Sequence, residues 1–296
     1  MNLLTDNKKG SRLFLILNCL ALGIIAMNLT APVHEATHLL TQMAAGAKPE
    51  VLAFGCAGTV DGTATANLDS VFWKVMFSGS AALMNIIIGT ILLIVLKKCR
   101  LGPLSRPLVL MTTMMHYSMG FGYFLRDFFM YDPNPDPDVQ QGDWAKVYEN
   151  FGGNLALRIT MLIIGCIGIL FVFYIAYRQA FHFISDNNDK KERNRVASAI
   201  YLFPYLLNAV VFTLVELNGP VAKANIESFL IISPIINIFG MIGFFWGYMF
   251  VAHMVKPRKD NVYYFSPCAE KKVVLWIVAL AVVAFDAFVL CPGIWF

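Results

Sequence analysis

The stretch from Ala31 to Leu40 reads APVHEATHLL and directly follows a long, almost entirely apolar run. His34 and His38 are four residues apart, so on a helix they share one face, where two imidazoles can hold one metal ion. Glu35 follows the first histidine. This is the HExxH arrangement, in which both histidines bind zinc and the glutamate acts as a general base towards water. The stretch therefore predicts a metal-dependent hydrolytic site.

The composition places this motif in a membrane protein. Of the 296 residues, 58% are hydrophobic and 14% are charged, and the mean hydropathy is +0.63. About seven apolar runs reach the roughly 20 residues that a membrane-spanning helix needs, and they begin near Leu13, Val71, Pro107, Leu155, Val196, Phe229 and Val273. We therefore expect an all-α polytopic membrane protein without a separate soluble domain.

The HExxH residues have a second interpretation, as a polar belt at the membrane interface or as partners of other polar side chains. The cost of ionisable groups at membrane depth argues against it, because such groups are rare there unless they serve a function or face a cavity. A continuous helix from Leu13 to Ala45 would be about 50 Å long, more than the bilayer thickness. Pro32 is therefore predicted to kink this helix or to start a new one.

Basic residues predict the orientation, because Lys and Arg stay on the cytoplasmic side. They form four clusters: Lys8, Lys9 and Arg12; Lys97, Lys98, Arg100 and Arg106; Arg178 with Lys190, Lys191, Arg193 and Arg195; and Lys256, Arg258 and Lys259 with Lys271 and Lys272. The clusters fall at every second turn. We expect a cytoplasmic N-terminus, an uncleaved first span, and an HExxH site towards the outer leaflet.

A zinc site of this kind needs a third protein ligand. His116 is rejected, because at ~15 Å from the cytoplasmic face it would lie deeper than the HExxH level, and it is interpreted as a polar residue inside the bundle. Asp127 lies at a better depth but adjoins Arg126. Asp143 follows a loop of prolines and aspartates at the point where the chain returns to the membrane. The choice between Asp127 and Asp143 stays open on this reasoning.

Three segments together resemble the site-2 protease family of intramembrane zinc metalloproteases. They are HEATH from His34 to His38, SGSAALMN from Ser78 to Asn85, and NPDP with the later GDW between Asn134 and Trp144. The resemblance covers roughly residues 13–175 and is closest to divergent, smaller members. It implies that Asp143 is the third zinc ligand, although the Asp-Gly order of the family is reversed here.

The resemblance also implies a domain division and a way of receiving substrate. Residues 1–180 would form the metalloprotease core, whereas residues 181–296 would add helices of unknown role. The β-formers of residues 48–68, with a turn at Asp61-Gly62, predict a short hairpin. In the family such strands help to receive substrate, although an ordinary surface hairpin fits the sequence equally well. Asn85 and Asn134 are candidate substrate-binding residues.

The leading expectation is a zinc-dependent intramembrane endopeptidase with one Zn²⁺ per chain. Glu35 would be the catalytic base, and His34, His38 and Asp143 would hold the metal, with Asp127 as the alternative third ligand. The substrate would be a membrane protein or peptide within the lipid bilayer, the location a bacterial cytoplasmic membrane, and no nucleic acid is expected as a partner. The alternatives are a zinc hydrolase of a lipid or other membrane amphiphile, and a non-catalytic scaffold or transport protein.

Overall fold

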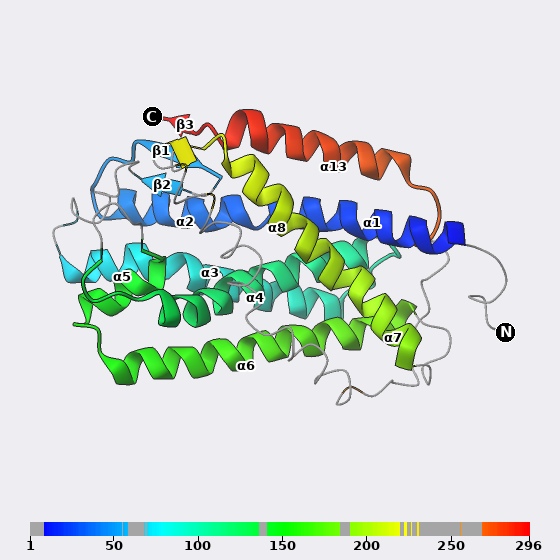
Figure 1. The fold of residues 1–296 in the computed structure, drawn as a ribbon, viewed down its shortest axis with the longest axis horizontal. Coiled ribbons are helices and arrows are strands. Elements are labelled where there is room, and N and C mark those ends of the chain that lie inside the picture. Colours follow the sequence, from blue (N-terminus) through cyan, green and yellow to red (C-terminus); the bar gives the residue numbers. More distant parts are fainter. Residues whose placement is uncertain are drawn as a thin grey trace.

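The structure is a computed structural model that describes residues 9–54, 56–58, 68, 70–135, 141–183, 190–219, 222–223, 226, 230, 255 and 268–296. The long helices are α1 (Lys9–Asn28), α2 (Ala31–Ala44), α3 (Val71–Lys98), α4 (Ser105–Met130), α6 (Leu155–Ala180), α8 (Phe203–Glu216) and α13 (Val273–Phe285). They form a bundle, in which α8 runs obliquely to the others (Figure 1). Two shorter helices, α5 (Asp143–Asn150) and α7 (Lys190–Ala197), lie at opposite ends of the bundle.

Five helical segments are long and apolar enough to cross a membrane. They are Arg12–Ala44, Val71–Lys98, Leu155–Phe183, Asn194–Glu216 and Val273–Leu290. The first combines α1 with α2, and the fourth joins the end of α7 to α8 through a π-helical turn, Ser198–Leu202. This confirms an all-α fold with several candidate membrane spans. The span predicted to begin near Phe229 lies outside the described residues.

The span predicted from Pro107 is α4, a helix of 26 residues that does not belong to this apolar set. Its position explains its composition. The helix packs against α1, α3 and α6, so most of its surface contacts protein, and it can carry buried Thr112, Thr113, His116 and Asp127. A helix surrounded in this way does not need an apolar outer face towards lipid.

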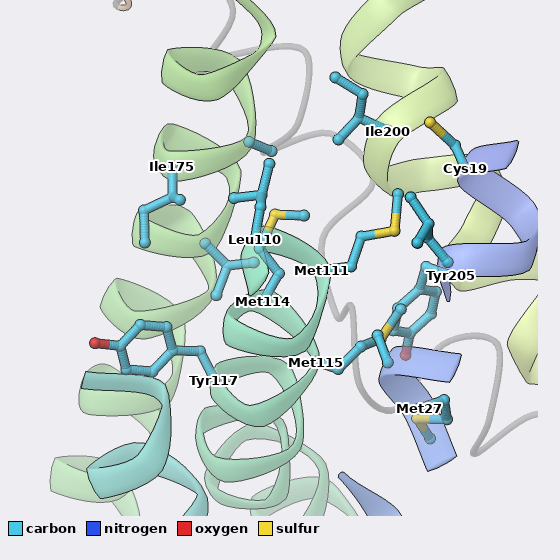
Figure 2. Close-up of a cluster of buried hydrophobic side chains, with 14 of the residues drawn as sticks. Cys19, Met27, Leu110, Met111, Met114, Met115, Tyr117, Ile175, Ile200 and Tyr205 are labelled. Atoms are coloured by element: carbon cyan, nitrogen blue, oxygen red, sulfur yellow. The ribbon is translucent and has the colours of Figure 1, made fainter. Parts of the chain in front are cut away.

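Methionines of α4 form the middle of the hydrophobic core. Met111, Met114 and Met115 are at most 2% exposed, and Figure 2 shows them between Ile175 of α6 on one side and Cys19 of α1 on the other. Unbranched methionine side chains fill irregular gaps between helices. They hold the central helix, which carries several of the polar residues described below, at a fixed place in the bundle.

The first transmembrane segment is interrupted before the HExxH motif. Helix α1 ends at Asn28, and α2 begins at Ala31 with Pro32 in its first turn. The Thr30 hydroxyl donates a hydrogen bond to the Ala26 carbonyl over 2.8 Å. This confirms the prediction that Pro32 starts a new helix, because proline has no backbone N–H and fits the first turn, where that group would be unpaired.

A small antiparallel sheet follows α2, in the order β2-β1-β3. Strand β1 (Val51–Ala53) pairs with β2 (Cys56–Gly58), so the predicted hairpin exists but reverses between Ala53 and Cys56. The predicted turn at Asp61-Gly62 lies outside the described residues. Tertiary contacts explain the earlier reversal, because the Phe54 ring packs on Phe212 with centroids 4.4 Å apart and its backbone N–H donates to the Leu290 carbonyl.

Strand β3 (Ile294–Trp295) was not predicted. It pairs with the other edge of β1, with Leu52 opposite Ile294. The strand has only two residues, too few to show the alternation that marks a strand in sequence. It brings the end of the chain to the same end of the bundle as α2 and α5 (Figure 1).

The later helices pack directly on the first one. Both α8 and α13 contact α1. The Asn18 amide of α1 donates to the carbonyls of Cys268 and Glu270, and its oxygen accepts from the Trp276 indole over 2.9 Å. Asp286, a buried acid without a predicted partner, accepts a hydrogen bond from Asn28. The division into residues 1–180 and 181–296 stays a prediction, and both parts contribute to one bundle.

Candidate metal centre

The two histidines of the motif point into the bundle from the same face of α2. His34 is 0% and His38 is 4% exposed, and their Nε2 atoms are 3.3 Å apart. This is the arrangement that i and i+4 positions predict on a helix. The two nitrogens are therefore close enough to bind one ion.

Asp143 completes a three-residue cluster. It is the first residue of α5, and its Oδ2 lies 3.1 Å from Nε2 of His34 and 3.1 Å from Nε2 of His38. Two ligands about 2.0–2.1 Å from a tetrahedral zinc ion lie about 3.3 Å apart. The nitrogen and oxygen atoms therefore form one triangular face of such a site and could hold a metal ion.

The protonation of Asp143 suits a metal ligand. Partial burial alone would raise the pKa of its carboxyl group, but the adjacent imidazoles of His38 and His34 outweigh that effect and hold the pKa well below its ordinary value. The group is therefore an ionised carboxylate near neutral pH, with an oxygen directed at both imidazoles.

His38 has its ring orientation set by the backbone of α3. Its Nδ1 lies 2.7 Å from the Phe77 carbonyl oxygen. A carbonyl oxygen only accepts, so Nδ1 carries the proton and donates. Nε2, which faces His34 and Asp143, is then the ring nitrogen that can bind a metal ion. Hydrogen bonding of the second ring nitrogen is the usual support of a metal-binding histidine.

His34 has a different partner, the side chain of Asn85 on α3. Asn85 Nδ2 lies 2.8 Å from His34 Nδ1, and its Oδ1 lies 2.9 Å from Nδ1 of His116 on α4. All three residues are at most 2% exposed. The structure brings His116 to within one side chain of His34, and His116 is not part of the three-residue cluster that could hold a metal ion.

Asp127 occupies a different position from Asp143. It is 0% exposed, its Oδ1 accepts a hydrogen bond from Arg126 over 2.6 Å, and its Oδ2 accepts from the backbone N–H of Trp144 over 2.7 Å. Ala145 N–H also donates to Oδ2. Asp127 therefore caps the N-terminus of α5, where the first N–H groups lack partners within the helix. It holds the helix that carries Asp143.

Gly142 permits this close approach. It precedes Asp143 as the N-cap residue of α5, and a Cβ atom added there would overlap the Asp127 carboxylate and the Arg126 guanidinium. Any other side chain would push the start of α5 away from α4. Gly142 therefore lets the backbones of α4 and α5 approach closely at this point.

Replacing Asp127 with asparagine is expected to destabilise the fold by about 3–5 kcal/mol, because the buried Arg126 charge loses its partner. Asp143 would remain in the chain, so metal binding should persist at saturating metal. Denaturation in detergent would measure the loss of stability. Asp132→Asn is the matched control, because Asp132 is exposed and, among the described residues, its carboxylate accepts a hydrogen bond only from the Asn134 N–H. Equal stability of the two variants would contradict the capping role of Asp127.

Two contacts behind His34, one aromatic stacking and one cation–π contact, were not predicted from the sequence. The Tyr123 ring stacks on His34 with centroids 4.9 Å apart and planes 14° apart, and the Arg126 guanidinium lies 4.1 Å from the centre of the Tyr123 ring. The spacing of Tyr123, Arg126 and Asp127 at one turn of α4 was the available signal, because i and i+3 positions are neighbours on a helix. Together they fix the plane of His34.

Glu35 lies beside the cluster on α2. It is 8% exposed, and none of the described residues forms a hydrogen bond or ion pair with its carboxyl group. Buried carboxyl groups are normally paired. Within the described part of the chain, this acid near His38 has no such partner and is available to exchange protons.

Asn134 lies away from these contacts. It is exposed in the loop after α4, where its backbone N–H donates to the Asp132 carboxylate over 2.9 Å. Asn85, in contrast, is directed at two imidazoles. The assignment of either residue to substrate binding stays a prediction.

Comparison of this chain with protein-family models, with curated proteins and with solved structures finds no significant match. The interpretation of the cluster therefore rests on its own geometry and on the motif that supplies two of its three residues.

Proposed function

We propose that this protein is a zinc-dependent intramembrane endopeptidase resembling the site-2 proteases. The observation that carries the proposal is the convergence of His34, His38 and Asp143 on one point, with Glu35 on the same helix as both histidines. Two imidazoles and one carboxylate with an open fourth position are typical of hydrolytic zinc sites.

The donor set favours zinc over other common ions. Mg²⁺ and Ca²⁺ prefer sites built from oxygen ligands, whereas zinc readily accepts imidazole nitrogen together with a carboxylate oxygen. The contacts of His38 with the Phe77 carbonyl and of Tyr123 with His34 supply the outer support that zinc ligands normally have. These features support one zinc ion per chain.

The roles of the residues follow from their positions. A bound zinc ion would supply a Lewis acid that polarises the peptide carbonyl and makes water a stronger nucleophile near neutral pH. Glu35 would take a proton from the attacking water and later deliver it to the leaving amine. His34, His38 and Asp143 would hold the ion, while Asp127 keeps Asp143 in place through the N-terminus of α5.

The setting of the cluster supports a membrane peptide as the substrate. Two ligands lie in a helix of the first candidate span, and α3 beside them is another span. A substrate that reaches this point must be apolar enough to enter the bilayer, as a transmembrane segment is. Cleavage of a lipid or another membrane amphiphile is the competing outcome of the test below.

The orientation is also proposed, with the cluster towards the outer leaflet. Basic residues lie in the last turns of α3 and α6, namely Lys97, Lys98 and Arg178, and Lys271 and Lys272 precede α13. These ends lie where α1 begins, opposite the end that carries α5 and the sheet (Figure 1). A cytoplasmic basic end places the N-terminus inside the cell.

Purified protein should cleave a transmembrane peptide, lose that activity to a strong zinc chelator and regain it when zinc is added back. The comparison substrate is a lipid extract of the membrane from which the protein is purified, assayed under the same conditions. Peptide cleavage without lipid turnover is the expected result. Turnover of lipid alone, or peptide cleavage that survives complete removal of metal, would contradict the proposal.

A further inference from the structure

A chain of three buried side chains extends from the metal cluster into the centre of the bundle. His34 on α2, Asn85 on α3 and His116 on α4 are linked through contacts of 2.8 Å and 2.9 Å. His116 does not contact the cluster itself and is absent from the metal-ligand set. Metal ligation therefore does not explain why His116 lies at the end of this row of contacts.

The orientation of the Asn85 amide in this structure assigns a proton to one nitrogen of each ring. Asn85 Nδ2 is a donor, so His34 accepts at Nδ1 and carries its proton on Nε2, where it donates to Asp143. Asn85 Oδ1 is an acceptor, so His116 donates from Nδ1. In this arrangement Nε2 of His34 carries a proton, so it has no lone pair with which to bind a metal ion.

Metal ligation by His34 requires the opposite arrangement. When Nε2 binds an ion, the neutral ring carries its proton on Nδ1, which must then donate. Asn85 can accept this bond only by turning its amide so that Oδ1 faces His34. Its Nδ2 then faces His116, which must accept at Nδ1 and carry its own proton on Nε2.

An imidazole at position 116 suits both arrangements. A neutral histidine donates or accepts at the same nitrogen, depending on which of its two nitrogens holds the proton. By exchange with water, each ring releases a proton from one nitrogen and takes one up at the other, so neither ring changes its charge. A residue that could only donate would hold Asn85 in the orientation that opposes metal binding.

We propose that His116 is a positioning residue that acts through Asn85 to let His34 exchange its proton between the two ring nitrogens when a metal ion binds. The proposal rests on the proposed metal site. It assigns His116 to metal affinity rather than to contact with the substrate.

The first test is the zinc affinity of two variants at position 116. His116→Leu removes both donor and acceptor and should weaken zinc binding about 10–100-fold, the usual effect of losing an outer partner of a metal ligand. His116→Asn retains a group that can donate or accept at nearly the place of Nδ1 and should restore most of the affinity. Thr113→Val is the matched control, because the only hydrogen bond of this buried hydroxyl among the described residues is to the Val109 carbonyl of its own helix.

The second test is the ¹⁵N NMR spectrum of histidine-labelled protein with and without zinc. The chain has five histidines, and the signals of His116 are identified by their loss in His116→Asn. Zinc should shift the His116 Nδ1 signal from the range of a protonated nitrogen to that of an unprotonated one. The imidazole should remain neutral in both spectra.

The outcomes separate this inference from the proposed function. A wild-type protein that binds no zinc would overturn the proposed function itself. Wild-type zinc affinity in His116→Leu, equal loss in both variants, or an unchanged His116 tautomer on zinc binding would each overturn the role of His116 while leaving the metal site intact.

Discussion

Replacing Glu35 with glutamine should abolish peptide hydrolysis while leaving the metal content of the protein unchanged. Glutamine has nearly the same shape as glutamate but cannot accept and return a proton at neutral pH. General acid and base catalysis contributes roughly 10²–10⁴-fold to rate, so a loss of this size in kcat is expected. Glu35 is not among the three clustered ligands, so zinc should remain at one ion per chain.

The measurement is single-turnover cleavage of a transmembrane peptide, together with elemental analysis of the same preparation. Glu149→Gln is the matched control, because Glu149 is exposed on α5, the helix that carries Asp143. The control should cleave as the wild type does. Retained cleavage by Glu35→Gln would remove Glu35 from the mechanism, and a simultaneous loss of zinc would make it a ligand or a structural support instead.

Asp143→Asn should lose zinc almost completely, and His34→Ala should do the same. Each change removes one of three protein ligands, whereas loss of an outer partner costs only about 10–100-fold in affinity. A neutral amide is a poor substitute for a carboxylate ligand. The loss caused by either variant should therefore exceed the loss caused by His116→Leu.

Competition with a chelator of known zinc affinity would rank these variants. Asp127→Asn belongs in the same series, because its carboxylate caps α5 without contacting the imidazoles. It should bind zinc when zinc is saturating. If Asp127→Asn lost the metal and Asp143→Asn kept it, the two aspartates would have to exchange their assigned roles.

The separation of these two aspartates shows where sequence reasoning stopped. Asp127 was expected at a suitable depth, and Asp143 lies where the chain returns to the membrane, so both were candidates for the third ligand. The decision depends on how α5 meets α4, which local pattern does not contain. Once the Asp127 carboxylate accepts the N–H of Trp144, its oxygens are occupied and Asp143 is directed at the histidines.

His116 shows the same limit from another direction. Depth counted along one helix placed it below the HExxH level, yet Asn85 connects it to His34. Counting residues along separate spans assumes that the helices are straight and equally placed in the membrane. Helices tilt and shift against one another, and only their packing shows which residues lie at one level.

The features that could be predicted from the sequence are those set by residues close together in the chain. Helical periodicity pairs His34 with His38, the apolar runs identify a multi-pass membrane protein, and Pro32 marks the start of α2. The third residue of the candidate metal cluster, the partner of each imidazole and the register of the sheet depend on contacts between segments far apart in the chain. Side-chain packing between neighbouring helices selects those contacts, so only the tertiary structure could decide them.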